Sequence, residues 1–219
     1  MVVLALSYKI FALSLNVIDS EKPQTIHRHR AAFSRNKLSV PCRTAIASGV
    51  LTLKTSHLDY GCGKGDDVRR LRAMGYDSTG WDYYWFKTET PKPADVVTLT
   101  YVINTIEEPL ERVQVLQNAF SLASTVLVIS VPNWCNKGRT PYGDGFVSQW
   151  NVFNKHYSQS ELTKFVEHTL NCKSHRLGQG IVAVYKQDYR RYSPSEVLDL
   201  KAELLQLKQE WVPGVHVFL

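Results

Sequence analysis

LDYGCGKGDDVRRLRAMGYDSTGWD, residues 58–82, is the stretch of sequence that decides the fold. It begins as the end of a strand and then turns through glycines at every second position, Gly61, Gly63 and Gly65. A helix over Val68–Met74 follows, and a second strand over Asp77–Trp81 ends at Asp82. The order strand, glycine turn, helix, strand and acid is typical of a cofactor-binding α/β unit.

The glycine turn predicts a ligand with a polar or charged end. Glycine adopts backbone angles closed to other residues and lets a ligand approach the main chain, and the helix that follows points free N–H groups at it. Asp82 lies 17 residues after Gly65, where an acid can accept hydrogen bonds from ribose hydroxyls. The predicted contacts to S-adenosyl-L-methionine (AdoMet) are Asp59, Tyr60, Gly61, Cys62, Gly63, Gly65, Asp82 and Tyr83.

Two alternatives to AdoMet stay open at this turn. A dinucleotide-binding motif has two residues between its second and third glycines, whereas this turn has only one, Lys64. The carboxylate of Asp59 would also repel a pyrophosphate by like charge. The turn can also be purely structural. An acid at position 59 suits a cationic, methionine-type ligand better than it suits a pyrophosphate.

The rest of the chain predicts an α/β fold with a doubly wound, mostly parallel sheet. Expected strands are Leu51–Leu58, Ala94–Leu99, Val126–Ser130 and a closing hairpin in 173–186. Expected helices are Cys42–Ala47, Val68–Met74 with Asp66 or Asp67 as its cap, Glu111–Ala123, a helix from the Ser158 and Glu161 capping box to Leu170, and an amphipathic helix in 191–219.

Asp59–Gly65 together with Asp82 resembles the first two motifs of class I AdoMet-dependent methyltransferases, which have a Rossmann-like sheet. A closer resemblance, over residues 25–186, is to the DNA phosphorothioation-associated methyltransferase family. It is carried by residues 58–82 and by IHRHRAAFSRNKLSVP (26–41), PADVVTLTYVINTIEEPLERVQVLQNAF (93–120) and GDGFVSQWNVFNKHYSQSEL (143–162). The resemblance implies methylation of DNA in a phosphorothioation modification system, with other proteins of that system as partners. Members are usually longer, so this chain resembles a shortened version.

One departure from class I enzymes concerns the third strand. Only 12 residues separate Asp82 from Asp95, too few for a further helix and strand, so we expect that strand to be absent. The usual acidic contact to the adenine amino group is then absent with it. Rings at Tyr83–Phe86 either wall the adenine instead or cover the edge of the sheet.

The catalytic residues are not identified by any motif. The fourth strand lacks the D/N/S-P-P-aromatic tetrapeptide of amino-directed DNA methyltransferases, and Pro41-Cys42 lies too early to be the usual cysteine nucleophile. Asn104 and Tyr101 are the candidates for substrate contact, with a turn-capping role for Asn104 as the alternative. The loop 131–156 is expected to act as a lid, or simply as structural cover.

Net charge favours an anionic partner only mildly: the formal charge is +6 and the pI about 9.1. Arg28, Arg30 and Arg35 form the candidate nucleic-acid contact, with ion pairs to the Glu107-Glu108 segment as the alternative. Two other functions stay open, a non-catalytic nucleic-acid-binding component with a degenerate fold, and an RNA or small-molecule methyltransferase.

The expected organisation is a basic N-terminal segment (1–50) on a methyltransferase-like core (51–190), followed by the helical tail (191–219). The four cysteines form no CxxC pair, which predicts neither a metal site nor a disulfide framework and fits a cytoplasmic protein. No stretch reaches the roughly 20 apolar residues of a membrane span.

Overall fold

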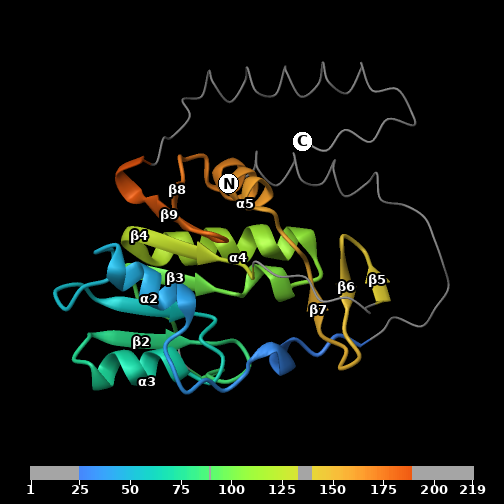
Figure 1. The fold of residues 1–219 in the computed structure, drawn as a ribbon, viewed down its shortest axis with the longest axis horizontal. Helices are drawn as coiled ribbons and strands as arrows, with labels where there is room; N and C mark the ends of the chain where they lie inside the picture. Colours follow the sequence, from blue (N-terminus) through green and yellow to red (C-terminus); the bar gives the residue numbers. More distant parts are fainter. Residues whose placement is uncertain (1–24, 89, 133–139, 189–219) are drawn as a thin grey trace, which may run out of the picture. The chain divides into compact units, whose positions relative to one another are not determined.

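A six-stranded sheet forms the centre of the computed structural model, which describes residues 25–88, 90–132 and 140–188 (Figure 1). Its strand order is β2-β1-β3-β4-β9-β8. The first four strands are parallel, β9 is antiparallel to β4, and β8 is antiparallel to β9. The predicted doubly wound, mostly parallel sheet is therefore confirmed. The strands are β1 (His57–Tyr60), β2 (Ser78–Trp81), β3 (Ala94–Thr100), β4 (Ala123–Ser130), β8 (His175–Gly178) and β9 (Ile181–Tyr185).

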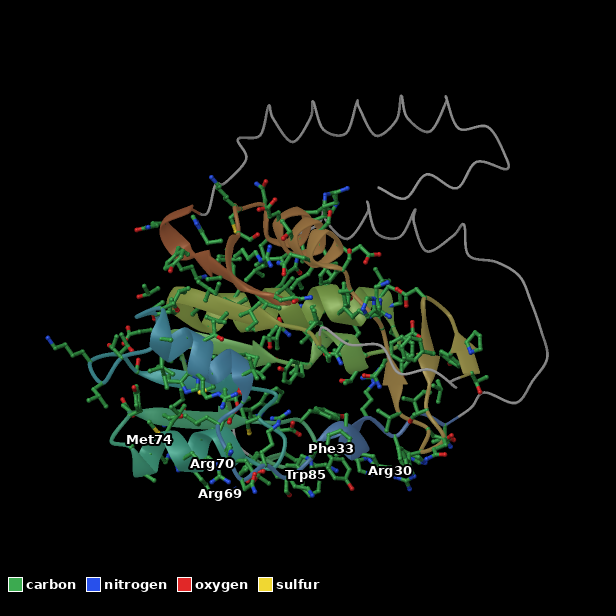
Figure 2. The ribbon with its side chains drawn as sticks, viewed as in Figure 1. Arg30, Phe33, Arg69, Arg70, Met74 and Trp85 are labelled. Carbon is green, nitrogen blue, oxygen red and sulfur yellow. The ribbon has the colours of Figure 1, made fainter. Side chains whose placement is uncertain are left out.

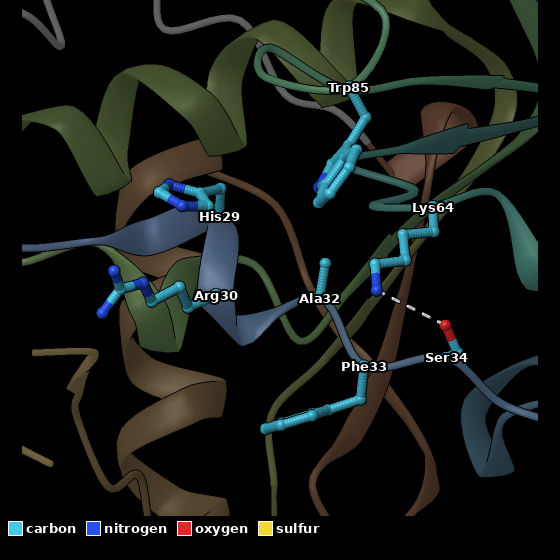
Figure 3. A pocket seen from close by; sticks show the side chains of 7 residues that line it. All are labelled: His29, Arg30, Ala32, Phe33, Ser34, Lys64 and Trp85. Carbon is cyan, nitrogen blue, oxygen red and sulfur yellow. Dashed lines mark hydrogen bonds between the residues drawn. The ribbon is translucent and has the colours of Figure 1, made fainter. Parts of the chain in front are cut away.

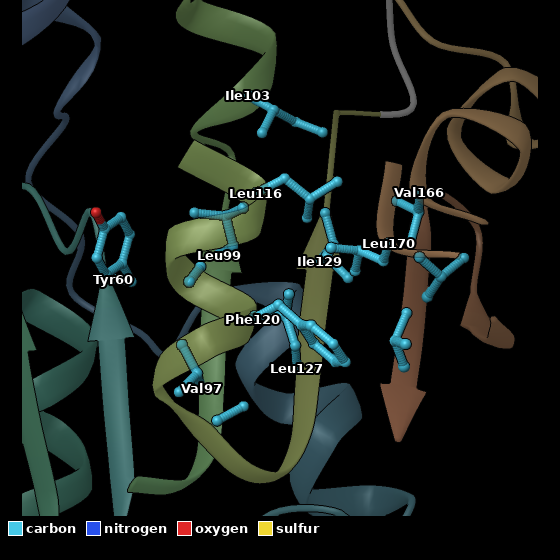
Figure 4. Close-up of a cluster of buried hydrophobic side chains, with 14 of the residues drawn as sticks. Tyr60, Val97, Leu99, Ile103, Leu116, Phe120, Leu127, Ile129, Val166 and Leu170 are labelled. Carbon is cyan, nitrogen blue, oxygen red and sulfur yellow. The ribbon is translucent and has the colours of Figure 1, made fainter. Parts of the chain in front are cut away.

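Apolar side chains cover both faces of this sheet because β3 and β4 alternate them from one face to the other. Leu99 and Ile129 join a cluster with α4 and α5, shown in Figure 4, whereas Val96 and Val128 join a second cluster with α2. The helices are α2 (Val40–Ala47), α3 (Asp66–Ala73), α4 (Pro109–Leu122) and α5 (Gln159–Leu170), with 3₁₀ turns η1 (Arg28–Ala31), η2 (Ile103–Thr105) and η3 (Lys186–Asp188).

The third strand of class I enzymes is absent from the described residues, as the chain length predicts. β2 is the last strand on its side of the sheet, and the described residues between Trp81 and Ala94 form turns and no strand or helix. The sheet edge beside the expected adenine position is therefore built without that strand.

Two local predictions were wrong. The strand expected over Leu51–Leu58 begins only at His57, because residues 52–55 form a turn held by the Thr55 hydroxyl. Neither aspartate caps α3: Gly65 is the N-cap residue, with a φ of 75°, and Asp66 and Asp67 lie in the first helical turn. Their carboxylates instead accept backbone N–H groups from residues 35 and 39.

The predicted loop 131–156 contains a small antiparallel sheet in its described part. Its strands β5 (Thr140–Tyr142), β6 (Gly145–Val147) and β7 (Phe153–Asn154) have only two or three residues each, too few to show a period of two in the sequence. The capping box at Ser158 and Glu161 is confirmed at the start of α5. The helix predicted in residues 191–219 lies outside the described residues, as do residues 1–24. Among the described residues, no helix is long and apolar enough to span a membrane.

Candidate cofactor site

The glycine turn sits where the carboxyl ends of β1, β2 and β3 meet. All three glycines have positive φ angles, 83° at Gly61, 55° at Gly63 and 75° at Gly65, which other residues adopt only under strain. The N–H groups of Gly61 and Cys62 both donate to the Trp81 carbonyl, at 2.7 and 3.0 Å. These bonds fix the turn against the end of β2.

Asp82, the predicted ribose contact, follows β2 directly, and its carboxylate organises the surrounding backbone. Its Oδ2 accepts the Gly63 N–H at 2.9 Å, and its Oδ1 accepts the N–H groups of Tyr84 and Trp85 at 2.9 and 3.0 Å. A carboxylate has about four acceptor positions. Three are used here, which leaves one on Oδ2 for a ligand hydroxyl.

Asp59 ends a buried chain of polar groups that crosses three strands. The strand register places His57 opposite Ser78 and Asp59 opposite Thr98. The Thr98 hydroxyl donates to Asp59 Oδ1 at 2.8 Å, and the two His57 ring nitrogens contact Thr98 and Ser78 at 3.0 and 2.8 Å. No described residue donates a hydrogen bond to Asp59 Oδ2, although the residue is only 4% exposed.

The protonation of this buried chain follows from its environment. Desolvation, followed by the negative charge of Asp67, raises the pKa of Asp59 to about 7, although the Thr98 hydrogen bond opposes the rise. Burial lowers the pKa of His57 to about 4, so the imidazole is neutral at neutral pH. Asp59 therefore titrates near neutrality and would hold its negative charge more firmly beside a cation.

Residues 25–39, here called the N-terminal strap, lie across the glycine turn. The backbone N–H of Arg35 donates to Asp66 Oδ2 at 2.7 Å, and that of Ser39 donates to Asp67 Oδ1 at 2.8 Å. A side chain at Gly63 would come within 2.9 Å of the Ala32 Cβ. The strap thus forms part of the wall of the site, a contact that no sequence motif indicates.

The three candidate arginines of the strap have different surroundings. Arg28 binds two acids, with Nε to Glu107 Oε2 at 2.7 Å and both terminal nitrogens to Glu111, which supports the ion-pair alternative for this residue. Arg30 is exposed and contacts the Trp150 carbonyl at 3.4 Å. Arg35 lies with its guanidinium carbon 5.5 Å from the centre of the Tyr101 ring.

An open hollow of about 350 Å³ lies between the strap and the residues that follow Asp82 (Figure 3). It is here called the aromatic-basic hollow, and it is lined by His29, Arg30, Ala32, Phe33, Ser34, Lys64 and Trp85. The side chains of Arg30, Phe33 and Trp85 come out at one edge of the molecule (Figure 2). Phe33 is 69% exposed and Trp85 is 40% exposed. Both rings are therefore accessible from solvent at the hollow.

Of the other rings after Asp82, one is exposed to solvent and another packs against the strap. Tyr83, a predicted cofactor contact, is 80% exposed, and Tyr84 stacks on His29 of the strap with ring centres 4.2 Å apart. Of the remaining predicted contacts, Tyr60 is buried against Trp81, and Cys62 is half-buried in the turn.

Tyr101 and Asn104 lie at the carboxyl end of β3, as predicted. Tyr101 has a φ of 58°, an unusual angle for a residue with a side chain and one that tends to occur at functional sites. Asn104 is 2% exposed, and its Nδ2 donates to Asn154 of β7 at 3.2 Å. Its side chain therefore joins the small sheet to η2 and caps no turn. Its Oδ1 has no partner among the described residues.

Cys42, the cysteine considered as a nucleophile from the sequence, is buried in α2. Cys42 is 3% exposed and burial raises the pKa of its thiol to about 12, which is unsuited to a nucleophile. Within the ranges that the structure describes, no three His, Cys, Asp or Glu side chains are grouped to hold a metal ion.

Solved structures of several methyltransferases are similar to this chain. One is the 1,6-didemethyltoxoflavin-N1-methyltransferase of Burkholderia thailandensis, with bound 1,6-didemethyltoxoflavin and S-adenosylhomocysteine: TM-score 0.49, 15% identity, covering 67% of this chain and 78% of that chain. Another is the magnesium protoporphyrin IX methyltransferase of Synechocystis PCC 6803 with bound S-adenosylhomocysteine. Its TM-score is 0.46 and its identity 12%, and the alignment covers 71% of this chain and 91% of that chain. A sugar N-methyltransferase of Streptoalloteichus sp ATCC 53650 has a TM-score of 0.46 and 14% identity, covering 70% and 85%.

The family assignment itself comes from a sequence-family model described as a methyltransferase domain, which matches residues 24–169, more than half of the chain. No curated protein matches. The match covers the whole strap and runs through the glycine turn, β3, β4, the small sheet and nearly all of α5. The chain therefore belongs to the methyltransferase domain family, whose methyl donor is S-adenosylmethionine.

Proposed function

We propose that this chain is an AdoMet-dependent methyltransferase that acts on nucleic acid, most specifically DNA in connection with a phosphorothioation modification system. The observation that carries the cofactor part is the placement of Asp59 and Asp82 on either side of a turn of three positive-φ glycines. The DNA and phosphorothioation part rests on the sequence resemblance and on the aromatic-basic hollow.

The residues present fit the methionine and ribose parts of the cofactor. Asp59 Oδ2 lacks a hydrogen-bond partner among the described residues and is an acceptor for an ammonium group. Asp82 Oδ2 retains one acceptor position for a ribose hydroxyl. The adenine has no third-strand acid to meet, so Phe86, whose ring lies beside Gly65 of the glycine turn, is the ring proposed to pack against it.

The mechanism that follows is one of alignment. When bound, the cofactor supplies a methyl group on a positively charged sulfur, which transfers to a nucleophile held in line with it. Asp82 fixes the turn and the ribose, and Asp59 fixes the ammonium end. Tyr101 and Asn104, at the end of β3, are the groups proposed to orient the acceptor. A strong base is not required for such a transfer.

The aromatic-basic hollow supports a nucleic-acid substrate. Exposed rings of Phe33 and Trp85 can stack on bases, and the cations of Arg30 and Lys64 suit phosphates. Lys64 lies 5.5 Å from the centre of the Trp85 ring, so charge and stacking surface are adjacent. An unpaired or flipped base would meet this combination more easily than a base inside a duplex.

A second candidate, a non-catalytic nucleic-acid-binding component, is favoured by one observation. Ala32 lies against Gly63 in the middle of the glycine turn, in the space that a side chain at position 63 would occupy. A strap fixed in this position would keep AdoMet away from the turn. In a methyltransferase, the strap would instead leave room for the cofactor to contact Asp82 and Asp59.

Titration calorimetry of the full chain with AdoMet separates these two candidates. Binding at micromolar concentrations supports the enzyme, and absence of heat at millimolar AdoMet excludes it. Transfer of labelled methyl groups is then measured in parallel on DNA, phosphorothioated DNA, RNA and lysate metabolites. Label in either DNA sample supports the proposed substrate, whereas label confined to RNA or metabolites assigns the alternative methyltransferase function.

A further inference from the structure

Arg35 carries a half-buried guanidinium that has no carboxylate partner among the described residues. The ion pairs of the described residues involve other cations, Arg28, Arg69, Arg112 and Lys155. The contact recorded for the Arg35 guanidinium is the face of the Tyr101 ring, 5.5 Å from its centre. A cation in this state keeps all five N–H donors available for a ligand.

The backbone around Arg35 is fixed from both sides by α3. Asp66 accepts the Arg35 N–H at 2.7 Å, and the Arg70 guanidinium donates to the Arg35 carbonyl. Because α3 directly follows the glycine turn, Arg35 is held in register with the turn even though it comes 26 residues before Gly61 in the chain. The side chain therefore has a defined position relative to the predicted cofactor contacts.

That position lies next to the methionine end of the predicted site. The positive charge of Arg35 acts on two groups there, opposing the raised pKa values of Asp59 and Tyr101, which burial causes. Arg35 does not line the aromatic-basic hollow, in contrast to Arg30. Arg35 thus faces the ends of β1 and β3 and not the surface proposed for nucleic acid.

A cation without a carboxylate partner, near an acid with one oxygen that accepts no hydrogen bond, suits a ligand that carries both charges. Asp59 and Arg35 interact electrostatically, yet no ion pair or hydrogen bond joins their side chains. The amino-acid end of AdoMet has an ammonium and a carboxylate on one carbon. An arginine fork matches a carboxylate with two parallel hydrogen bonds.

We infer that Arg35 binds the α-carboxylate of the methionine part of AdoMet, opposite the ammonium position at Asp59. This inference rests on the proposed AdoMet site and assigns Arg35 to the cofactor, not to nucleic acid as its basic surroundings in the sequence predict. The N-terminal strap then supplies a binding residue, which explains why it is fastened to both aspartates of α3.

The test compares two ligands that differ by the carboxylate. AdoMet and decarboxylated S-adenosylmethionine are titrated by calorimetry into the unaltered chain, Arg35→Met, Arg35→Lys and the matched control Lys37→Met, an exposed cation of the same strap. We expect Arg35→Met to weaken AdoMet about 10- to 100-fold and to leave the decarboxylated ligand unchanged, since a charge-assisted pair of bonds is lost. Arg35→Lys should retain part of the preference for AdoMet, and Lys37→Met all of it.

Each outcome separates the inference from the proposed function. If Arg35→Met binds AdoMet as the unaltered chain does, or weakens both ligands equally, Arg35 does not bind the carboxylate, while AdoMet binding itself stands. If the unaltered chain binds neither ligand, the proposed cofactor and this inference fail together. Circular dichroism and the melting temperature of Arg35→Met, measured without ligand, show whether a loss of binding comes from a loss of fold.

Discussion

Arg112 of α4 and Asp144 of the β5–β6 turn form a two-pronged ion pair, with both N–O distances at 2.6 Å. The guanidinium is 2% exposed and also donates to the carbonyls of Ile106 and Glu107. Burial raises the pKa of Asp144, but Arg112 and Lys155 outweigh this effect and hold the pKa below its usual value. One buried side chain thereby attaches the small sheet to the core.

Asp144→Ala should destabilise the protein because it leaves the Arg112 charge buried without its carboxylate partner. Loss of one partner of a buried pair costs about 3–5 kcal/mol, and the partial exposure of Asp144 reduces this to about 1–3 kcal/mol. Urea unfolding of the variant and of Glu108→Gln, an exposed control near α4, measures the difference. Equal unfolding midpoints would show that the pair contributes nothing.

Asp59→Asn should change how stability depends on pH. A native pKa of about 7, against an ordinary 3.8, means that the stabilisation from this group is complete below pH 3.8 and is lost as the pH rises to about 7. Asparagine does not ionise. The free energy of unfolding of the variant, relative to the unaltered chain, should therefore rise with pH over this window, by up to about 4 kcal/mol.

His57 affects the pH dependence of stability in the opposite direction. Because its pKa is lowered from 6.5 to about 4, its stabilisation is complete above pH 6.5 and is lost as the pH falls to about 4. That contribution is common to both proteins and cancels in the difference between them. Urea unfolding at intervals from pH 4 to 8 supplies the comparison. Parallel pH profiles would contradict the raised pKa of Asp59.

Gly61→Ala tests the shape of the turn by combining two costs. The φ of 83° is strained for alanine, and the added Cβ would lie 2.5 Å from Val102 Cγ2. We expect a loss of about 2–4 kcal/mol in unfolding free energy, of which the strain accounts for about 1–2 kcal/mol. Gly49→Ala, with a φ of 72° and open space around it, measures the strain alone.

Val102→Ala should recover the steric part of that loss in the double variant. A double-mutant cycle over positions 61 and 102 isolates this coupling. If the two substitutions are additive, Val102 does not restrict position 61.

Asp82→Ala should remove most of the rise in melting temperature that saturating AdoMet produces in the unaltered chain, because ligand binding raises stability by mass action. It should also destabilise the unliganded protein by about 1–3 kcal/mol, since three N–H groups lose their acceptor. Differential scanning fluorimetry with and without AdoMet measures both effects. Asp77→Asn, an exposed acid before β2, serves as the control. An undiminished AdoMet-induced rise in Asp82→Ala would place the ribose elsewhere.

Phe33→Ala and Trp85→Ala should each weaken binding of single-stranded DNA about 5- to 150-fold, the loss expected for one base stacked on a ring. Leu53→Ala replaces an equally exposed apolar residue outside the aromatic-basic hollow and should bind as before. Fluorescence anisotropy of a labelled oligonucleotide, repeated over a salt series, gives the affinities. Unaltered affinity in both ring variants would remove the hollow from the nucleic-acid interface.

The features that could be predicted from the sequence are those encoded in consecutive residues. The β1, turn, α3 and β2 unit is encoded in consecutive residues, so its position and the placement of Asp59 and Asp82 were predictable. The apolar run at Ala94–Leu99 gave β3, and simple chain length gave the missing third strand. These features depend on spacing and hydrophobicity alone.

Contacts between distant segments left no such signal. Arg35 and Asp66 meet across 31 residues, and Ser39 and Asp67 across 28, through backbone N–H groups that any residue possesses. Strands of two or three residues, such as β7, fall below the length at which alternation becomes visible. The role inferred for Arg35 therefore required the fold, because its sequence neighbours indicate only a basic segment.

The N-terminal strap also has a consequence for biosynthesis. Its residues leave the ribosome before every group that holds them, since Asp66 follows Arg35 by 31 residues and Glu111 follows Arg28 by 83. During translation the strap has nothing to dock on, and the sheet must assemble first. The strap is made before its partners and is thus among the last segments of the domain to settle, so the Arg35 side of the proposed cofactor site is completed only when the rest of the domain is in place.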